Sequence, residues 1–123
     1  MAVDIASLEV ALRASWQSDT SDAPDLWTAT NPARGQCAVT AKVVQDYFGG
    51  TLVIAAVLRD GEPVEKHCWN VLPSGEHVDL TAVQFDFDYV LGEPVEQEPI
   101  VDHTGVNRHL LLASRVADHL SHP

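Results

Sequence analysis

Cys37 occupies a position that favours thiol reactivity, because it follows a loop and begins a predicted helix directly after Gly35-Gln36. The N–H groups at a helix N-terminus and the helix dipole favour negative charge, so a thiol there ionises more readily than a free cysteine. A nucleophilic thiolate also needs a general base, and the base needs a group that orients it. Without such partners, a cysteine more often serves as a small buried hydrophobe.

A predicted hairpin after this helix supplies both further groups. His67 lies in its first strand, 64–72, and Asp79 lies in its second strand, 76–80. A two-residue turn between the strands would leave His67 and Asp79 on opposite faces of the hairpin, because successive side chains in a strand alternate between faces. The turn therefore decides whether the two side chains can meet.

The turn residues favour the register that brings His67 and Asp79 together. The segment Pro73-Ser74-Gly75 fits a type I turn followed by a left-handed residue, which forms a three-residue hairpin loop with a bulge. This loop places Trp69 opposite Asp79. His67 and Asp79 then become diagonal neighbours on one face, about 7–8 Å apart between backbones.

If the helix that begins at Cys37 packs on that face, the thiol meets the imidazole. His67 would then take the thiol proton, while Asp79 would fix the tautomer of the ring and stabilise the imidazolium. The thiolate would attack a carbonyl. The backbone N–H of Cys37 would be one oxyanion donor, and the side chain of Gln36 or Asn31 would be a second.

Each of these residues also has a plainer interpretation. His67 is one of six histidines and could be an ordinary strand residue, while Asp79 could be a turn or cap residue. Cys68 points to the face opposite His67, and we expect it to serve in packing. The remaining histidines toward the C-terminus have no metal-ligand spacing and are interpreted as solvated or helix-terminal residues: His103, His109, His119 and His122.

The composition is that of a small acidic globular protein. The chain has 123 residues, 46% of them hydrophobic and 20% charged, which fits one domain over 1–123. The formal net charge of -11 argues against nucleic acid or an anionic membrane as a partner. We find no signal-peptide pattern and no stretch of membrane-spanning length, and therefore expect a cytoplasmic protein whose two cysteines are free thiols.

Hydrophobic periodicity predicts the elements that position these residues. Helical spacing occurs three times, over 4–16, 36–47 and 106–120. The β-branched run 51–58 predicts a strand buried on both faces, which precedes the hairpin 64–80. Residues 81–89 have no clear pattern, and 91–102 is expected to be a surface loop or an edge strand. This order predicts an α+β fold in which an antiparallel sheet packs against helices.

Several of these segments resemble a known family. The runs WTATNPARGQC at 27–37, HCWN at 67–70, LPSGE at 72–76 and VDLT at 78–81 are similar to those of the small bacterial YunG-like proteins. These proteins in turn resemble minimal transglutaminase-like and papain-like cysteine enzymes, in which a helix-tip Cys is followed by His and then Asp or Asn on neighbouring strands. The resemblance implies that core fold and a catalytic triad of Cys37, His67 and Asp79. It implies no particular substrate.

The leading hypothesis is a cysteine-dependent acyl-transfer enzyme that needs no cofactor. It would act on an amide or thioester carbonyl of a small-molecule or peptide-like substrate, with water or an amine as acceptor. The alternative is a non-catalytic binding or regulatory module that uses the acidic surface and a cleft lined by Trp16, Trp27 and Trp69. A third hypothesis is a zinc site, which is weak because no second Cys or His lies at short ligand spacing.

Overall fold

The computed structural model describes residues 3–97 and 107–122. Its α-helices are α1 (Ile5–Ser15), α2 (Cys37–Phe48) and α3 (Arg108–Ser121). Short 3-10 helices are η1 (Ser18–Thr20), η2 (Pro24–Leu26) and η3 (Ala82–Gln84). The strands are β1 (Thr51–Arg59), β2 (Glu62–Val71), β3 (His77–Val78), β4 (Val90–Leu91) and β5 (Val95–Gln97). The fold is α+β with an antiparallel sheet, as the sequence predicts.

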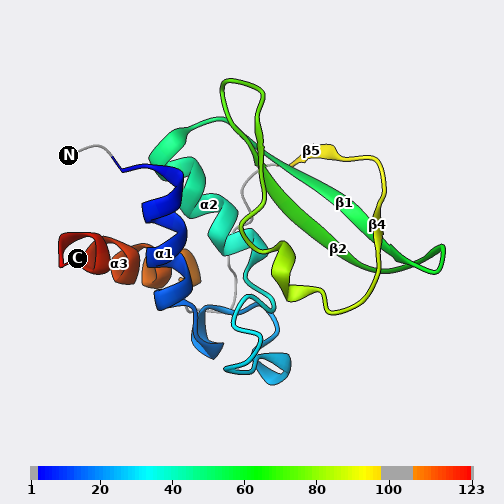
Figure 1. Ribbon diagram of the computed structural model, residues 1–123, viewed down its shortest axis with the longest axis horizontal. Coiled ribbons are helices and arrows are strands. Elements are labelled where there is room, and N and C mark those ends of the chain that lie inside the picture. The colour runs from blue at the N-terminus through cyan, green and yellow to red at the C-terminus, as the bar shows by residue number, and fades with distance from the viewer. Residues whose placement is uncertain (1–2, 98–106, 123) are drawn as a thin grey trace.

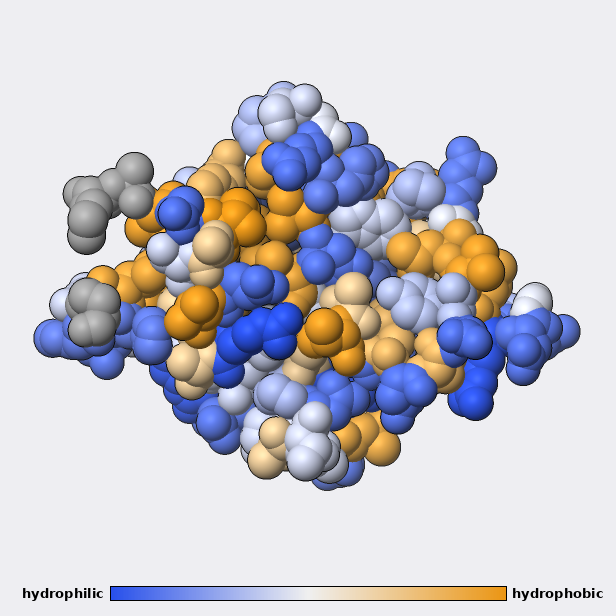
Figure 2. Space-filling view, viewed as in Figure 1, coloured by the Kyte–Doolittle hydropathy of each residue, from blue (hydrophilic) through white to orange (hydrophobic). Residues whose placement is uncertain are grey.

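The helices gather at one side of the molecule, and the β1–β2 hairpin extends away from them (Figure 1). α2 packs on both β2 and α3, and α1 packs on α3. Apolar residues from all three helices form one core, joined by Ala33 from the long loop: Leu8, Ala11, Leu12, Trp16, Ala33, Val43, Val44, Leu112 and Val116. On the face seen in Figure 2, hydrophilic residues cover both ends of the long axis. The position of α2 is thus set from two sides, by the helical core and by the sheet.

β1 is the central strand of the sheet. It pairs with β2 along one edge and with β4 and β5 along the other, while β3 adds to the outer edge of β2. Within β1, Leu52, Ala55 and Val57 are buried and the other residues are half-buried or exposed, so the predicted burial on both faces holds only in part. The expected edge strand in 91–102 is present as β5, and residues beyond Gln97, including His103, lie outside the described residues until 107.

The β2–β3 turn has the predicted register. The Leu72 N–H donates to the Glu76 carbonyl at 2.9 Å, and the Gly75 N–H donates to the Leu72 carbonyl at 2.8 Å. Asn70 pairs with Val78 in the ladder. Gly75 has a φ of 89°, the left-handed conformation that the bulged loop requires. The three-residue loop is confirmed.

The loop between α1 and α2 closes tightly on itself just before Cys37. The Asp22 N–H donates to the Gly35 carbonyl at 2.8 Å, and the Ser21 hydroxyl donates to the Arg34 carbonyl at 2.7 Å. Gly35 has a φ of 75°, and a Cβ on it would lie 2.3 Å from Ser21 Oγ and 2.8 Å from the Ala23 nitrogen. Both the backbone conformation and the close approach require glycine at this position.

We expect Gly35→Ala to lower the free energy of unfolding by more than the cost of placing an alanine in the left-handed conformation. The matched control is Gly61→Ala, because Gly61 has a φ of 81° and no atom within 4 Å of the added Cβ. Gly61→Ala should cost about 1–2 kcal/mol of unfolding free energy. Gly35→Ala should cost about 1–3 kcal/mol more, because its methyl group overpacks the loop. Urea unfolding measures both values, and equal values would contradict the close packing.

Candidate functional site

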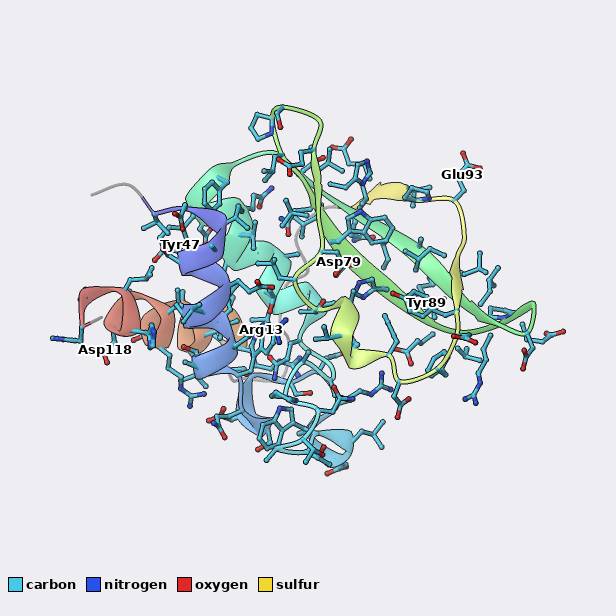
Figure 3. The ribbon with its side chains drawn as sticks, viewed as in Figure 1. Arg13, Tyr47, Asp79, Tyr89, Glu93 and Asp118 are labelled. Carbon is cyan, nitrogen blue, oxygen red and sulfur yellow. The ribbon has the colours of Figure 1, made fainter. Side chains whose placement is uncertain are left out.

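His67 and Asp79 form a hydrogen-bonded pair. His67 lies in β2 with its side chain fully buried, and its Nε2 lies 2.7 Å from Asp79 Oδ2. Because a carboxylate can only accept, Nε2 carries the proton in this pair. The other oxygen, Asp79 Oδ1, accepts from the Thr81 N–H at 3.3 Å. The Asp79 side chain lies beside β2 and close to η3 (Figure 3). The His67 ring and the Thr81 N–H thus each bind one oxygen of the Asp79 carboxylate and fix its position.

Cys37 is the first residue of α2 and is half-buried. A hydrogen bond with Cys68, supplemented by the hydrogen bond and charge of His67, holds the pKa of the Cys37 thiol well below its usual value, although burial opposes the shift. Burial by itself would lower the pKa of His67, but hydrogen bonds to Asp79 and Cys37, together with their charges, raise it to about 9. Both shifts favour a thiolate beside an imidazolium over the neutral pair.

α2 packs on a different face of the sheet from the one that a direct contact between Cys37 and His67 would require. The Asn70 side-chain amide donates to the Ala41 carbonyl at 2.8 Å, and Cys68 packs with Ala41 and Cys37. α2 therefore packs on the face of β2 that carries Cys68 and Asn70, not on the face that carries His67. The condition that the sequence set for a contact between Cys37 and His67, packing of α2 on the His67 face, is therefore not met.

Cys37, at the N-terminus of α2, nevertheless lies near enough to His67 for the imidazole to help lower the pKa of its thiol. The ladder between β2 and β3 covers Asn70 and Val71, and His67 and Cys68 lie further along the strand. Cys68 does pack between α2 and the sheet, as predicted, and it also affects Cys37, because it contributes to the lowered pKa of the Cys37 thiol. The hydrogen bond with Cys37, together with burial, raises the pKa of the Cys68 thiol, so its shift is opposite to that of Cys37.

Aromatic side chains enclose the imidazole of His67. Trp69 stacks on it with ring centroids 5.8 Å apart, and Phe85 meets it edge-on at 5.0 Å. The Trp69 Nε1–H in turn donates to His77 Nδ1 at 3.0 Å. Rings on these sides keep water away from the imidazole, which strengthens its electrostatic interactions with Asp79 and Cys37.

Gln84, at the end of η3, connects the loop before Cys37 with the His67 ring. Its Oε1 accepts from the Gly35 N–H at 3.3 Å, its Nε2 donates to the Thr81 carbonyl at 3.1 Å, and Nε2 also lies 3.5 Å from His67 Nδ1. Its backbone carbonyl accepts from Asn31 Nδ2 at 3.0 Å. Gln84 and Phe85 fall in the segment 81–89, whose pattern gave no signal, so sequence reasoning missed both.

The two predicted oxyanion side chains hold the loop in place. Gln36 is 0% exposed, its Oε1 accepts from the Thr20 hydroxyl at 2.9 Å, and its Nε2 donates to the Gln17 carbonyl at 3.0 Å. These internal hydrogen bonds do not support Gln36 as the second oxyanion donor, because they occupy its amide in the interior. Asn31 uses one amide N–H to fasten the loop to Gln84.

The structure does not bring the three tryptophans together as one cleft. Trp16 is 1% exposed within the helical core and donates to the Thr40 hydroxyl at 2.9 Å. Trp27 packs against its own loop, where Nε1 donates to the Pro32 carbonyl at 2.9 Å. Trp69 alone of the three contacts His67. The hollow near Tyr89, about 400 Å³ in volume, lies elsewhere and is lined by Leu58, Asp60, Gly61, Asp88, Tyr89 and Val90.

Among the other described histidines, His77 is linked to the site through Trp69, and the two with carboxylate partners lie apart from it. His109 pairs with Asp46, and His122 lies 3.6 Å from Asp118. Over residues 3–97 and 107–122, no group of three or more His, Cys, Asp and Glu side chains is arranged to hold a metal ion. Within the same ranges, no helix is both long and apolar enough to cross a membrane.

Comparison with known proteins places the chain in a family. A family model described as YunG protein matches residues 4–121. A protein of Bacillus subtilis (strain 168) named "Uncharacterized protein YunG" is 38% identical over 74 residues, which are 60% of this chain and 56% of that protein. The chain therefore matches little more than half the length of that relative. No solved structure matches the chain. Because the family model spans nearly the whole sequence, the chain belongs to the YunG family.

Proposed function

We propose that this protein is a cysteine-dependent acyl-transfer enzyme in which Cys37 is the nucleophile, His67 the proton carrier and Asp79 the residue that orients the ring. The observation that carries the proposal is the pair of His67 and Asp79, with 2.7 Å between His67 Nε2 and Asp79 Oδ2, beside a Cys37 thiol whose pKa is lowered in part by His67. Because Nε2 is bound to the carboxylate, Nδ1 remains as the nitrogen that exchanges a proton with Cys37.

The chemistry follows from these positions. The Cys37 thiolate attacks an amide or thioester carbonyl, and the carbonyl electrons move to oxygen, giving a tetrahedral oxyanion. The Cys37 N–H, at the first residue of α2, has no partner within the helix and is suited to donate to that oxyanion. The His67 imidazolium then gives its proton to the departing amine or thiol. Water or an amine, deprotonated by the neutral ring, releases the acyl group and restores the thiol.

Cys37, His67 and Asp79 follow one another in the order used by transglutaminase-like and papain-like enzymes, and this resemblance supports the proposal. The net charge of -11 is compatible with an uncharged or cationic carbonyl substrate and unfavourable for nucleic acid. We place the enzyme in the cytoplasm, where the thiol stays reduced. The alternative of a binding module loses part of its support, because the three tryptophans do not form a shared cleft.

The first prediction concerns the charge state of Cys37. A thiol with a pKa near 8.5 is only about 1% thiolate at pH 6.5, so a lowered pKa makes Cys37 far more reactive there than a free cysteine. We expect His67→Asn to slow alkylation of Cys37 by iodoacetamide at pH 6.5 by about tenfold or more, because it removes the imidazolium. Peptide mapping by mass spectrometry assigns the label to Cys37.

The control for this experiment is His109→Asn. The imidazole of His109 also pairs with a carboxylate, that of Asp46, but at the end of α2 opposite Cys37. This variant should alkylate at the rate of the unmodified chain. Equal and slow alkylation of all three proteins, at the rate of a free thiol, would remove the basis for a nucleophilic Cys37.

The second prediction concerns turnover. Full-length protein incubated with a chromogenic acetyl thioester should form an acetyl adduct on Cys37 and release acetate, and Cys37→Ser should abolish both. Asp79→Asn should lower kcat/KM by about 100-fold or more, because the ring loses its orienting carboxylate. Asp46→Asn, which removes the carboxylate paired with His109, is the matched control and should retain full activity.

One result of this experiment would contradict the enzyme proposal. If no acyl adduct forms on Cys37 with thioester or amide probes, and a partner isolated with the protein binds Cys37→Ala equally well, the chain acts as a binding module.

A further inference from the structure

The proposed acyl transfer makes no use of Cys68, although this thiol is the hydrogen-bond partner that contributes most to the pKa shift of Cys37. Cys68 is 3% exposed and packs with Ala41 and Leu52 in the small core between α2 and the sheet. A second thiol next to a reactive one makes an intramolecular disulfide possible. The protein contains no cysteine besides Cys37 and Cys68.

The packing of α2 on β2 fixes this neighbourhood independently of any protonation state. The hydrogen bond from Asn70 to the Ala41 carbonyl, 2.8 Å long, joins the two elements at one point. From there, Cys37 lies four residues back along the helix, about 6 Å, and Cys68 lies two residues back along the strand, about 6.6 Å. Because α2 and β2 run in the same direction, the two steps end at the same level. Cys37 and Cys68 thus come together as neighbours, and both are reduced.

The two thiols differ in access as well as in protonation. Cys37 is half-buried at the helix end, whereas Cys68 is covered by α2 and β1. An oxidant from solvent therefore meets Cys37 first. Exposed, ionised cysteines with a second thiol nearby are the ones that oxidise reversibly, because the second thiol traps the first oxidation product before it is oxidised further.

We propose that Cys37 and Cys68 form a peroxide-oxidised modification site, in which Cys37 reacts first and Cys68 resolves it to an intramolecular disulfide. In the first step, the Cys37 sulfur attacks one oxygen of hydrogen peroxide, the O–O bond breaks, and the departing hydroxide takes the His67 proton to become water. Cys37 is then a sulfenic acid. This step uses the same thiolate and imidazolium as acyl transfer but does not depend on that activity.

The second step forms the disulfide. The Cys68 sulfur attacks the Cys37 sulfur, and the S–O bond breaks. The departing hydroxide takes the Cys68 proton and leaves as water. Overall, two thiols lose two electrons and two protons, and one hydrogen peroxide becomes two waters. The product has no thiolate at residue 37, so oxidation switches off any chemistry that depends on it, and a dithiol reductant restores it.

The test uses the reduced full-length protein and one molar equivalent of hydrogen peroxide. We expect loss of two free thiols per chain, a monomeric mass lower by two hydrogens, and a cross-linked peptide pair that contains Cys37 and Cys68. Dithiothreitol should reverse all three changes. The unmodified chain gives this result by itself, so the test does not depend on a variant that might fold poorly.

Two variants then assign the roles of the thiols. Cys68→Ala should still react, and dimedone should label its Cys37 as a sulfenic acid at least tenfold more than in the unmodified chain. Cys37→Ser should consume peroxide at least tenfold more slowly, because Cys68 is buried. The proposal is overturned if the treated chain retains a free Cys68 while Cys37 becomes sulfinic acid, or if the disulfide joins two chains. If the reduced protein shows no acyl transfer but still forms the disulfide, only the proposed function is overturned.

Discussion

The buried imidazole of His67 is the constraint on which the site depends. Its side chain is completely inaccessible, and a charged group in such a place is costly unless opposite charges and hydrogen bonds compensate. Asp79 provides that compensation at 2.7 Å, and Trp69 and Phe85 restrict the ring to one orientation. With Nε2 bound to the carboxylate, Nδ1, which lies 3.5 Å from Gln84 Nε2, is the nitrogen left for the proton transfer that we propose. Burial by itself favours the neutral form of His67, so the charge of the ring depends on Asp79 and Cys37.

Fixing the carboxylate in turn constrains the chain on both sides of it. The bulged turn at Gly75 sets the register that brings Asp79 to the face of His67, and the Thr81 N–H directs the chain from Asp79 into η3. Gln84, at the end of η3, binds the Gly35 N–H and so reaches the loop that precedes Cys37. These hydrogen bonds therefore connect the β2–β3 hairpin, η3 and the loop before Cys37 in one network. A displacement of any member is transmitted to the others through short, directional bonds rather than through general packing.

Local rules predicted much of this arrangement from the sequence. The register of the hairpin followed from three turn residues, because the conformations open to Pro73 and Gly75 admit few alternatives. The placement of Cys37 at a helix start followed from the glycine before it. These features depend on residues within one turn of the chain, and for that reason the single sequence contained the information.

The errors arose where tertiary packing decides. Both faces of the hairpin carry residues suited to burial, so the sequence did not reveal that α2 would cover Cys68 and Asn70. Trp16 and Gln36 carry polar groups typical of binding sites, yet each finds an internal partner, Thr40 for the indole and Thr20 and Gln17 for the amide. An internal partner far along the chain leaves no local pattern. The contribution of Gln84 was hidden for the same reason, because its partners lie up to 53 residues away.

The charge of the whole protein and the charge at Cys37 act at different ranges. A net charge of -11 disfavours a further negative charge, but salt screens exposed charges beyond about 8 Å at physiological ionic strength. The hydrogen bonds from Cys68 and His67 act at contact distance in a site that is partly closed to water, so they determine the state of the thiol. The acidic surface determines instead which reagents approach. It repels anions and leaves uncharged molecules unaffected, and both a neutral acyl donor and hydrogen peroxide belong to that class. A thiolate at Cys37 would therefore suit both proposed reactions, and the reagent that it meets, an acyl donor or hydrogen peroxide, would decide which one occurs.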